Sequence, residues 1–293
     1  MLDKAITAAA EAVNEFLESV LPDPTGPEGR LHEAMRYCTL GGGKRLRPFL
    51  VAETARMLGV DPRRALRAGA AVELIHTYSL IHDDLPAMDD DDMRRGQPSC
   101  HVAFDDATAI LAGDALLTLA FEVLAAPETH ADAAVRCVLI GGLARAAGAA
   151  GMVGGQMIDL ASENIISHAA LISRLERMKT GALIAFCCEA GATIADASAE
   201  ERETLREFGF ELGLAFQIVD DLLDVEGDEV ALGKSVGKDE AAGKATFVST
   251  LGADGARREA LALINRAVAR LRPFEMAEEP LRKFCDYLLT RRS

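Results

Sequence analysis

Apolar residues recur along the chain at the three- and four-residue spacing of amphipathic α-helices. At the N-terminus this spacing places one apolar face on Leu2, Ile6, Val13, Phe16 and Leu17. Alternating runs rich in β-branched residues, which would predict strands, are nearly absent. The pattern therefore predicts an all-α protein.

Glycine and proline divide this pattern into helices. A helix over Arg30–Leu40 should end at the three glycines 41–43, and Pro48 suits the first turn of the next helix. Further helices are expected at about residues 62–82, 107–126, 131–151, 167–195, 199–225, 255–270 and 280–291, and a loop rich in glycine and lysine at 233–243. No proline- or serine-rich linker divides the chain, so we expect a single domain over residues 1–293.

The charge balance narrows the classes of partner. The chain has 293 residues and a formal net charge of −15. Nucleic-acid binding depends on a basic surface, and attachment to an anionic membrane depends on clustered lysine and arginine, so both are excluded as primary roles. An acidic protein that binds a phosphate ester needs local positive charge from metal ions or from clustered cations.

The chain is expected to be cytoplasmic. Its six cysteines form no Cys-x-x-Cys pair, and residues 1–4 lack the basic start of a signal peptide. The most apolar stretch, Ile110–Pro127, is interrupted by Asp114 and Glu122. It falls short of the ~18 uninterrupted apolar residues of a spanning helix, so we expect no integral membrane segment.

Two aspartate-rich motifs interrupt apolar, helix-like stretches. The first reads Asp-Asp-Leu-Pro-Ala-Met-Asp over residues 83–89, and the second reads Asp-Asp-Leu-Leu-Asp over 220–224. Unpaired buried carboxylates are costly, which favours a role in holding divalent cations. Mg²⁺ prefers hard oxygen ligands and commonly joins a few carboxylates to a substrate's phosphates. The alternative interpretation is a solvated acidic face.

The two motifs differ in local geometry. Asp220 and Asp224 lie one turn apart on one helical face. Pro86 should end or kink the first helix, and a distorted turn could then bring Asp89 back toward Asp83. The acidic run that starts at Asp89 suggests a calcium loop, but it lacks the central glycine and final glutamate of an EF-hand.

Three cationic segments accompany the aspartates. Arg94-Arg95 follows the first motif, and its guanidinium groups suit phosphate oxygens, although simple charge balance is the alternative. Lys44 and Arg47 follow the glycine run at the start of a helix, where anions are favoured. This segment is not a Walker A loop, since Arg45 stands where serine or threonine is required. The lysine-bearing loop after the second motif could be a closing lid or a flexible solvated loop.

Taken together, these motifs resemble those of the trans-polyprenyl synthases. The resemblance rests on the two aspartate motifs, Gly-Gly-Lys-Arg-Leu-Arg-Pro before the first, Arg-Arg-Gly after it, Gly-Gly-Gln-Met-Ile-Asp-Leu at 154–160, Lys179-Thr180-Gly181 and Gln217. Their order and spacing extend over nearly the whole chain. The two extra residues in the first motif resemble the bacterial members that make farnesyl diphosphate.

The resemblance implies an all-α fold with antiparallel helices around a central catalytic cavity, in a homodimer that binds diphosphate substrates. It implies three Mg²⁺ ions, with Mn²⁺ as an alternative ion, held chiefly by Asp83, Asp89 and Asp220 and supported by Asp84, Asp221 and Asp224. The allylic diphosphate would be bound by Arg94, Lys179 and Lys234, with Lys244 acting with the lid. The diphosphate of isopentenyl diphosphate would be bound by Lys44, Arg47, His76 and Arg95.

The implied chemistry is ionisation of the allylic C–O bond, attack by the isopentenyl double bond and loss of a proton to the pyrophosphate. Thr180, Gln217 and the carbonyl group of Lys179 would face the carbocation. Tyr78, with Ser79 beside it, would act as the floor that stops elongation at the farnesyl product. The alternatives are geranyl or geranylgeranyl output, a terpene cyclase, and a non-catalytic subunit of a heteromeric synthase or another acidic helical binding protein.

Overall fold

The computed structural model describes residues 2–162, 169–226, 246–274 and 279–290. Within these ranges the regular structure is helical apart from a two-stranded hairpin of β1 (Met93–Arg94) and β2 (Gln97–Pro98). The predicted all-α class is therefore confirmed. The chain forms two compact units, the first made of Met1–Ala52 and Asp61–Ile140, the second of Glu53–Val60 and Gly141–Ser293.

The first unit contains the hairpin and most of the N-terminal helices. These are α1 (Leu2–Val20), α2 (Gly29–Leu40), η1 (Pro62–Ala65), α4 (Leu66–Asp83), α5 (Cys100–Ala103) and α6 (Asp106–Ala125). The boundary between the units falls within α3 (Leu46–Met57) and α7 (Ala133–Ala147). The second unit contains α8 (Met152–Ser162), α9 (Ala169–Glu176), η2 (Arg177–Gly181), α10 (Ala182–Ile194), α11 (Ala199–Glu226), α14 (Phe247–Leu271) and α15 (Glu279–Thr290).

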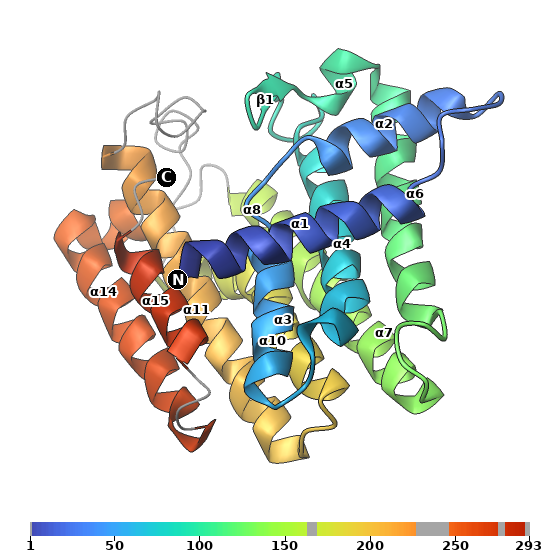
Figure 1. Cartoon of the computed structure of the whole chain (residues 1–293). Coiled ribbons are helices and arrows are strands. Elements are labelled where there is room, and N and C mark those ends of the chain that lie inside the picture. The colour runs from blue at the N-terminus through green and yellow to red at the C-terminus, as the bar shows by residue number, and fades with distance from the viewer. Residues whose placement is uncertain (1, 163–168, 227–245, 275–278, 291–293) are drawn as a thin grey trace. The chain divides into compact units, whose positions relative to one another are not determined.

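Helix α4 is the core element of the first unit, where it packs against α6 and α1 (Figure 1). It is apolar nearly all round, and Val72, Leu74 and Ile75 are fully buried. Burying each large apolar side chain contributes about 1.5–3 kcal/mol, so this packing fixes the helix that carries the first aspartate motif. Asp105 caps α6 by accepting a 2.8 Å hydrogen bond at Oδ1 from the Thr108 backbone N–H.

A buried ion pair anchors the glycine run that follows α2. Arg45 Nη1 lies 2.7 Å from Glu73 Oε1 on α4, and the Arg45 side chain is 0 % exposed. The guanidinium also donates to Asn14 Oδ1 at 2.9 Å and to the Thr39 carbonyl oxygen at 2.5 Å. Arg45 is therefore a structural residue of the first unit.

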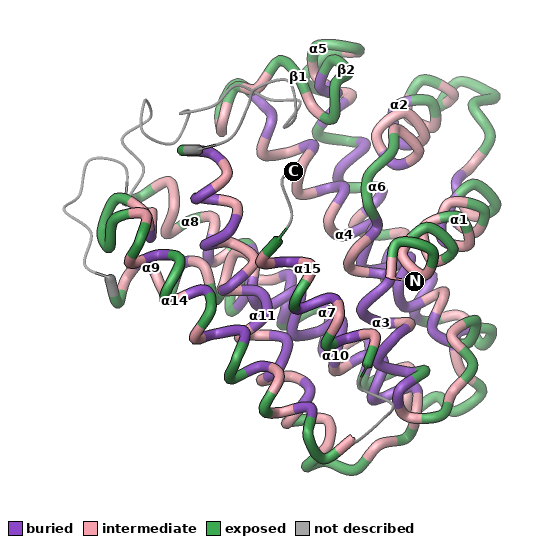
Figure 2. Tube along the Cα trace, turned by 60° about the vertical axis from the view of Figure 1, so that its left-hand side comes forward, coloured by how far each residue is buried: buried purple, intermediate pink, exposed green. Residues whose placement is uncertain are grey.

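In the second unit, α11 packs against α10 on one side and α14 on the other. Figure 2 shows the buried positions along α11 and α10. Two glycines on α11 permit close approach: a Cβ at Gly213 would lie 2.8 Å from the Gly181 Cα, and one at Gly209 would lie 2.5 Å from the Ala185 Cα. These contacts place the end of η2 directly against the helix that carries the second aspartate motif.

Most predicted helices are present with boundaries shifted by a few residues. The main exception is α14, which begins at Phe247 where the pattern predicted about 255, because Thr246 and Ser249 form a capping box there. The single helix predicted over 167–195 contains the π-helical turn η2. Helix α8, the short α5 and the hairpin were missed. The predicted loop at 233–243 lies outside the described residues.

Two described stretches bear on the expectation that the chain has no integral membrane segment, which stays a prediction. By length and mean hydropathy, Asp106–Ala125 and Ala133–Ala161 are both long and apolar enough to cross a membrane. The interruptions at Asp114 and Glu122 do not lower the mean hydropathy of the first stretch below that level. Core helices of soluble proteins meet the same criterion, so these stretches are weak support for a membrane span.

Candidate active site

The first aspartate motif forms a tight turn at the end of α4. The helix ends at Asp83, as the position of Pro86 predicted. The chain then folds back, and the Asp89 N–H donates a 2.8 Å hydrogen bond to the Asp83 carbonyl oxygen. The prediction that a distorted turn returns Asp89 to Asp83 is thus confirmed, and both residues remain partly exposed.

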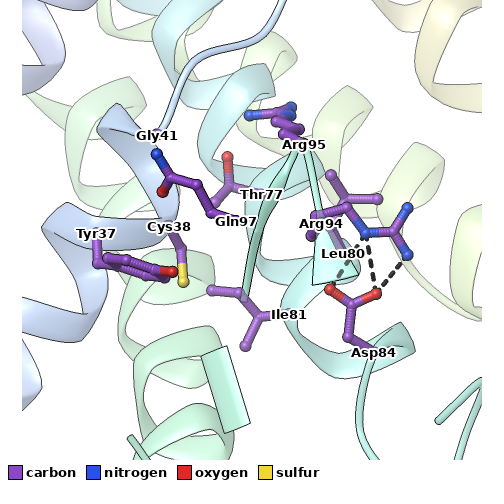
Figure 3. A pocket seen from close by; sticks show the side chains of 10 residues that line it. All are labelled: Tyr37, Cys38, Gly41, Thr77, Leu80, Ile81, Asp84, Arg94, Arg95 and Gln97. Atoms are coloured by element: carbon purple, nitrogen blue, oxygen red, sulfur yellow. Dashed lines mark hydrogen bonds and ion pairs between the residues drawn. The ribbon is translucent and has the colours of Figure 1, made fainter. Parts of the chain in front are cut away.

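Asp84 points to a different partner, the guanidinium group of Arg94. Arg94 Nε lies 3.0 Å and 3.2 Å from the two Asp84 carboxylate oxygens, and Nη2 also contacts Oδ1 (Figure 3). The Asp84 side chain is 3 % exposed. Burial raises the pKa of its carboxyl group, and the Arg94 guanidinium partly offsets that rise. In this structure Asp84 therefore orients an arginine rather than presenting its oxygens to solvent.

The β1–β2 hairpin brings Arg95 to the glycine run. Its two turn residues, Arg95 and Gly96, have φ values of 53° and 77°, as a type I′ turn requires. Arg95 Nη1 donates to the Gly42 carbonyl oxygen at 2.5 Å. A Cβ at Gly43 would lie 2.9 Å from Arg95 Cζ, so glycine leaves the space that the guanidinium fills. The two cationic segments predicted from the sequence thus meet.

Positive charge concentrates around His76 on α4. Burial, with further contributions from Arg47, Arg95, Arg94 and Arg45, holds the pKa of His76 well below its ordinary value, so the ring is neutral. Burial and the neighbouring Arg45, Arg47 and Arg94 also lower the pKa of Arg95. The Nε atom of Arg47 is buried without a hydrogen-bond partner. A cluster with this excess of donors and positive charge suits a polyanion.

A pocket opens beside this cluster, within the first unit (Figure 3). Arg94 and Arg95 supply its charged wall, and Thr77, whose hydroxyl is buried without a partner, supplies a polar one. The remaining lining comes from α2, α4 and β2, namely Tyr37, Cys38, Gly41, Leu80, Ile81, Asp84 and Gln97. Lys44 is exposed at the glycine run.

The neutral state of His76 predicts a pH effect on stability. The folded-state pKa is lowered, so below the ordinary histidine value near 6.5 the unfolded chain gains a proton that the folded chain does not bind. His76 therefore costs stability as the pH falls, up to about 1.4 kcal/mol by pH 5.5. Urea unfolding of a His76→Asn variant should show a smaller loss between pH 7.5 and 5.5 than the parent shows. Equal losses would contradict the burial of a neutral ring.

The second aspartate motif lies on α11, in the second unit. Asp221 and Asp224 are buried, at 4 % and 5 % exposure, and Asp220 is partly exposed. Asp221 accepts a 3.0 Å hydrogen bond from Gln217 Nε2 and a 3.2 Å bond from the Phe247 backbone N–H. Asp221 thus connects the motif to the start of α14. Asp220 and Asp224 share one helical face, as the spacing predicted.

Lys179 and Thr180 lie in the π-helical turn η2, a backbone form that often marks functional positions. Thr180 Oγ1 donates to Gln217 Oε1 at 3.1 Å, and Gln217 in turn donates to Asp221. Lys179 Nζ lies 2.6 Å from Asp159 Oδ2 on α8. The structure therefore brings the three predicted catalytic residues, Lys179, Thr180 and Gln217, together beside the second motif.

Two residues of α8 were not singled out from the sequence. Asp159 pairs with Lys179, and Gln156 has both amide atoms buried without hydrogen-bond partners. A Cβ at Gly155 would lie 2.3 Å from the Lys179 backbone nitrogen, so this glycine allows α8 to approach η2. The sequence signal for Gln156 and Asp159 was the segment Gly-Gly-Gln-Met-Ile-Asp-Leu, in which these two polar residues interrupt an apolar stretch directly after paired glycines.

The donor set fits Mg²⁺ in chemistry. In the first unit, Asp83 and Asp89 provide carboxylates on one tight turn, and the second unit separately provides the partly exposed carboxylate of Asp220. Oxygen donors of this type are the ligands that Mg²⁺ prefers. Among the described residues, no three or more such side chains already form a metal-binding group. Lys234 and Lys244, predicted to bind the allylic diphosphate, lie outside the described residues.

An all-α fold with two carboxylate motifs and a cluster of partly buried arginines suits an enzyme that binds phosphorylated substrates. Residues 28–278 match the model of the polyprenyl synthetase family, and the chain belongs to that family. It is therefore a prenyltransferase, as its resemblance predicted.

Curated relatives and solved structures cover nearly the whole chain. The farnesyl diphosphate synthase of Escherichia coli is 44 % identical, with 99 % of this chain and 97 % of that protein covered. The farnesyl diphosphate synthase of Haemophilus influenzae is 42 % identical, with 96 % and 95 % covered. An FPP/GFPP synthase structure from Zymomonas mobilis is 46 % identical, with a TM-score of 0.89 and 99 % of each chain covered.

Proposed function

We propose that this chain is a farnesyl diphosphate synthase, which condenses isopentenyl diphosphate with dimethylallyl diphosphate and then with geranyl diphosphate. The observation that carries the proposal is the cluster of Arg47, Arg94 and Arg95 around neutral His76, close to the first aspartate motif. The chain as a whole has a net charge of −15, so a local concentration of positive charge supports the binding of a polyanionic ligand at this place. Several curated relatives at 41–44 % identity carry the same activity in their names.

The two diphosphates have separate binding groups in this proposal. Lys44, Arg47, His76 and Arg95 bind isopentenyl diphosphate, and the orphaned Nε of Arg47 and the neutral His76 ring supply hydrogen bonds to it. Arg94 and Lys179, with Lys234 and Lys244, bind the allylic diphosphate. Both Arg94 and Lys179 are held by a carboxylate, Asp84 and Asp159 respectively, which orients each cation before substrate arrives.

Mg²⁺ ions, three in number and replaceable by Mn²⁺, would be held by Asp83, Asp89 and Asp220 with support from Asp84, Asp221 and Asp224, and would neutralise charge on the departing diphosphate. Arg94 and Lys179 stabilise the same charge through hydrogen bonds. Thr180 and Gln217, whose side chains are hydrogen-bonded to each other in this structure, and the carbonyl group of Lys179 would face the allylic carbocation. After the isopentenyl double bond attacks, the released pyrophosphate accepts the proton.

The protein acts as a single polyprenyl synthase domain in a cytoplasmic homodimer. Helix α6 supports the homodimer, because Ile110 and Leu111 are 44 % and 57 % exposed on an otherwise strongly apolar helix. A second copy of the chain packed against this face would remove these exposed apolar side chains from water without a membrane. Light scattering should give twice the mass of one chain, and a monomer would contradict the assignment.

Incubation with Mg²⁺, isopentenyl diphosphate and dimethylallyl diphosphate tests the function. After dephosphorylation, chromatography should show farnesol as the main product. Omission of Mg²⁺ should abolish turnover, and Mn²⁺ should restore it. The absence of any condensation product would reject the proposal, and geranylgeraniol as the main product would reject its chain-length assignment.

Tyr78 is expected to set the product length. Its side chain is 6 % exposed in the last turns of α4, five residues before Asp83, a helical rise of about 7.5 Å. Burial raises the pKa of its hydroxyl to about 12, so the ring stays neutral. A Tyr78→Ala variant should make geranylgeranyl and longer diphosphates in place of farnesyl diphosphate. Farnesol alone from that variant would show that Tyr78 is only a core residue.

A further inference from the structure

His82 lies one turn after Tyr78 on the same face of α4. The two rings meet edge to face, with their centroids 5.7 Å apart and their planes at 81°. This arrangement is the favourable one for aromatic rings, because the positive edge of one ring faces the negative face of the other. His82 therefore supports the Tyr78 ring from the side nearest the aspartate motif.

The His82 ring is itself anchored on α6. Its Nε2 atom lies 3.1 Å from the carbonyl oxygen of Ile110. A carbonyl oxygen can only accept, so Nε2 carries a proton and donates it. This bond fixes the ring against a neighbouring helix and limits its rotation.

Gly113 on α6 provides the space that the His82 ring occupies. A Cβ at this position would lie 2.1 Å from Nε2 and 2.5 Å from Cδ2, so no other residue is compatible with the present ring position. Glycine is disfavoured inside helices, and its place in α6 is explained by this contact. The three residues form one stack, in which Gly113 admits His82 and His82 contacts Tyr78.

We propose that His82 and Gly113 are positioning residues for product length, because they fix the Tyr78 ring at the end of the chain-elongation site. The proposal rests on the proposed function, since Tyr78 limits product length only in a prenyltransferase. His82 acts through Tyr78 and is not assigned any contact with substrate. Product length would thus be set by α4 and α6 together, and not by the residues beside the first motif alone.

Product analysis of His82→Ala tests the proposal. Loss of the His82 ring removes the lateral support of Tyr78, so the ratio of geranylgeranyl to farnesyl product should rise. The expected rise is roughly 2- to 10-fold, the factor that corresponds to the free energy of one aromatic contact. Ratios are compared at equal total turnover, because His82 adjoins Asp83 and its loss can also lower the rate. In the double variant Tyr78→Ala/His82→Ala, the product ratio should equal that of Tyr78→Ala.

Gly113→Ala gives a second test, in which no residue of the aspartate motif and no residue next to it in the sequence is substituted. The added methyl group displaces the His82 ring, which breaks its contacts with Ile110 and Tyr78 together, so the product ratio should shift in the same direction. Gly141→Ala on α7 is the matched control. A Cβ there meets only Arg145 Nη1, at an ordinary distance of 3.5 Å, and the products should not change.

The outcomes separate the inference from the proposed function. If the parent enzyme makes no farnesyl product, the proposed function fails. If Tyr78→Ala makes longer products while His82→Ala and Gly113→Ala make farnesyl product alone, the positioning role is overturned. A double variant that shifts well beyond Tyr78→Ala would also overturn it, because His82 would then act independently of Tyr78. If His82→Ala is inactive, the ratio of geranylgeranyl to farnesyl product made by Gly113→Ala decides whether the positioning role holds.

Discussion

Replacement of Asp83 or Asp220 by alanine is expected to lower kcat by about 1,000-fold or more, since metal ions contribute several kcal/mol to the stabilisation of charge in transition states. Both carboxylates are partly exposed, Asp83 at the end of α4 and Asp220 on α11. Neither belongs to the buried core, so each variant should retain its helical circular dichroism. Steady-state kinetics with saturating substrates and a Mg²⁺ titration measure the effect.

Asp254→Ala is the matched control for these variants. Asp254 is a carboxylate on α14 whose side chain is 87 % exposed, where it pairs only weakly with Arg257 at 3.2 Å. Its removal should leave turnover within about 2-fold of the parent, as surface substitutions usually do. Near-normal rates in Asp83→Ala or Asp220→Ala would show that the aspartates form a solvated acidic face and would reject the metal assignment.

Arg45→Met is expected to cause a large loss of stability, about 3–5 kcal/mol, because it leaves the buried Glu73 carboxylate with only a longer contact, 3.8 Å, to Arg95 Nη2. Arg45 and Glu73 lie 2.7 Å apart with side chains 0 % and 3 % exposed. Arg45 also satisfies the side chain of Asn14 and the carbonyl group of Thr39. Urea unfolding followed by circular dichroism measures the loss of free energy of unfolding.

Two comparisons make this second prediction specific. The double variant Arg45→Met/Glu73→Leu should recover much of the loss, because it removes both members of the buried pair, and Arg95, which also contacts Glu73, is 24 % exposed and keeps access to solvent. Arg63→Ala removes an ion pair of similar length, 2.5 Å to Asp61, that is 87 % and 43 % exposed, and it should not measurably move the unfolding midpoint. If Arg45→Met behaves like Arg63→Ala, the buried pair does not anchor the glycine run.

Sequence reasoning succeeded where the physical rule is local. Pro86 ends α4 because its ring excludes the helical path, and the return of Asp89 to Asp83 follows from the turn that results. The β1–β2 hairpin was not predicted, because strands of two residues each are too short to show the alternation of apolar and polar residues. Sequence reasoning also missed α8, in which Gly154 and Gly155 are poor helix formers but allow close contact with η2.

The division of roles among the charged residues was also beyond local rules. Arg45 and Arg47 are two positions apart in one basic segment, yet Arg45 is buried against Glu73 while Arg47 keeps an unpaired Nε atom. Asp83 and Asp84 are adjacent, yet only Asp84 is buried against Arg94. Composition and spacing treat the members of each pair as equivalent. Their environments differ because Arg45 lies just before α3 with a φ of 49° and Asp84 lies just after the end of α4, where the direction of a side chain depends on the turn and not on spacing.

The all-α class, the two carboxylate motifs, the cationic segments and the family could be predicted from the sequence, because helical periodicity and motif spacing act over a few residues. Which charges are neutralised and which remain for a ligand depends on the tertiary structure. Asp84 with Arg94, Arg45 with Glu73 and Lys179 with Asp159 are pairs between different elements, 10, 28 and 20 residues apart in the chain. Such pairs depend on how these elements pack, since burial sets the cost of each unpaired charge.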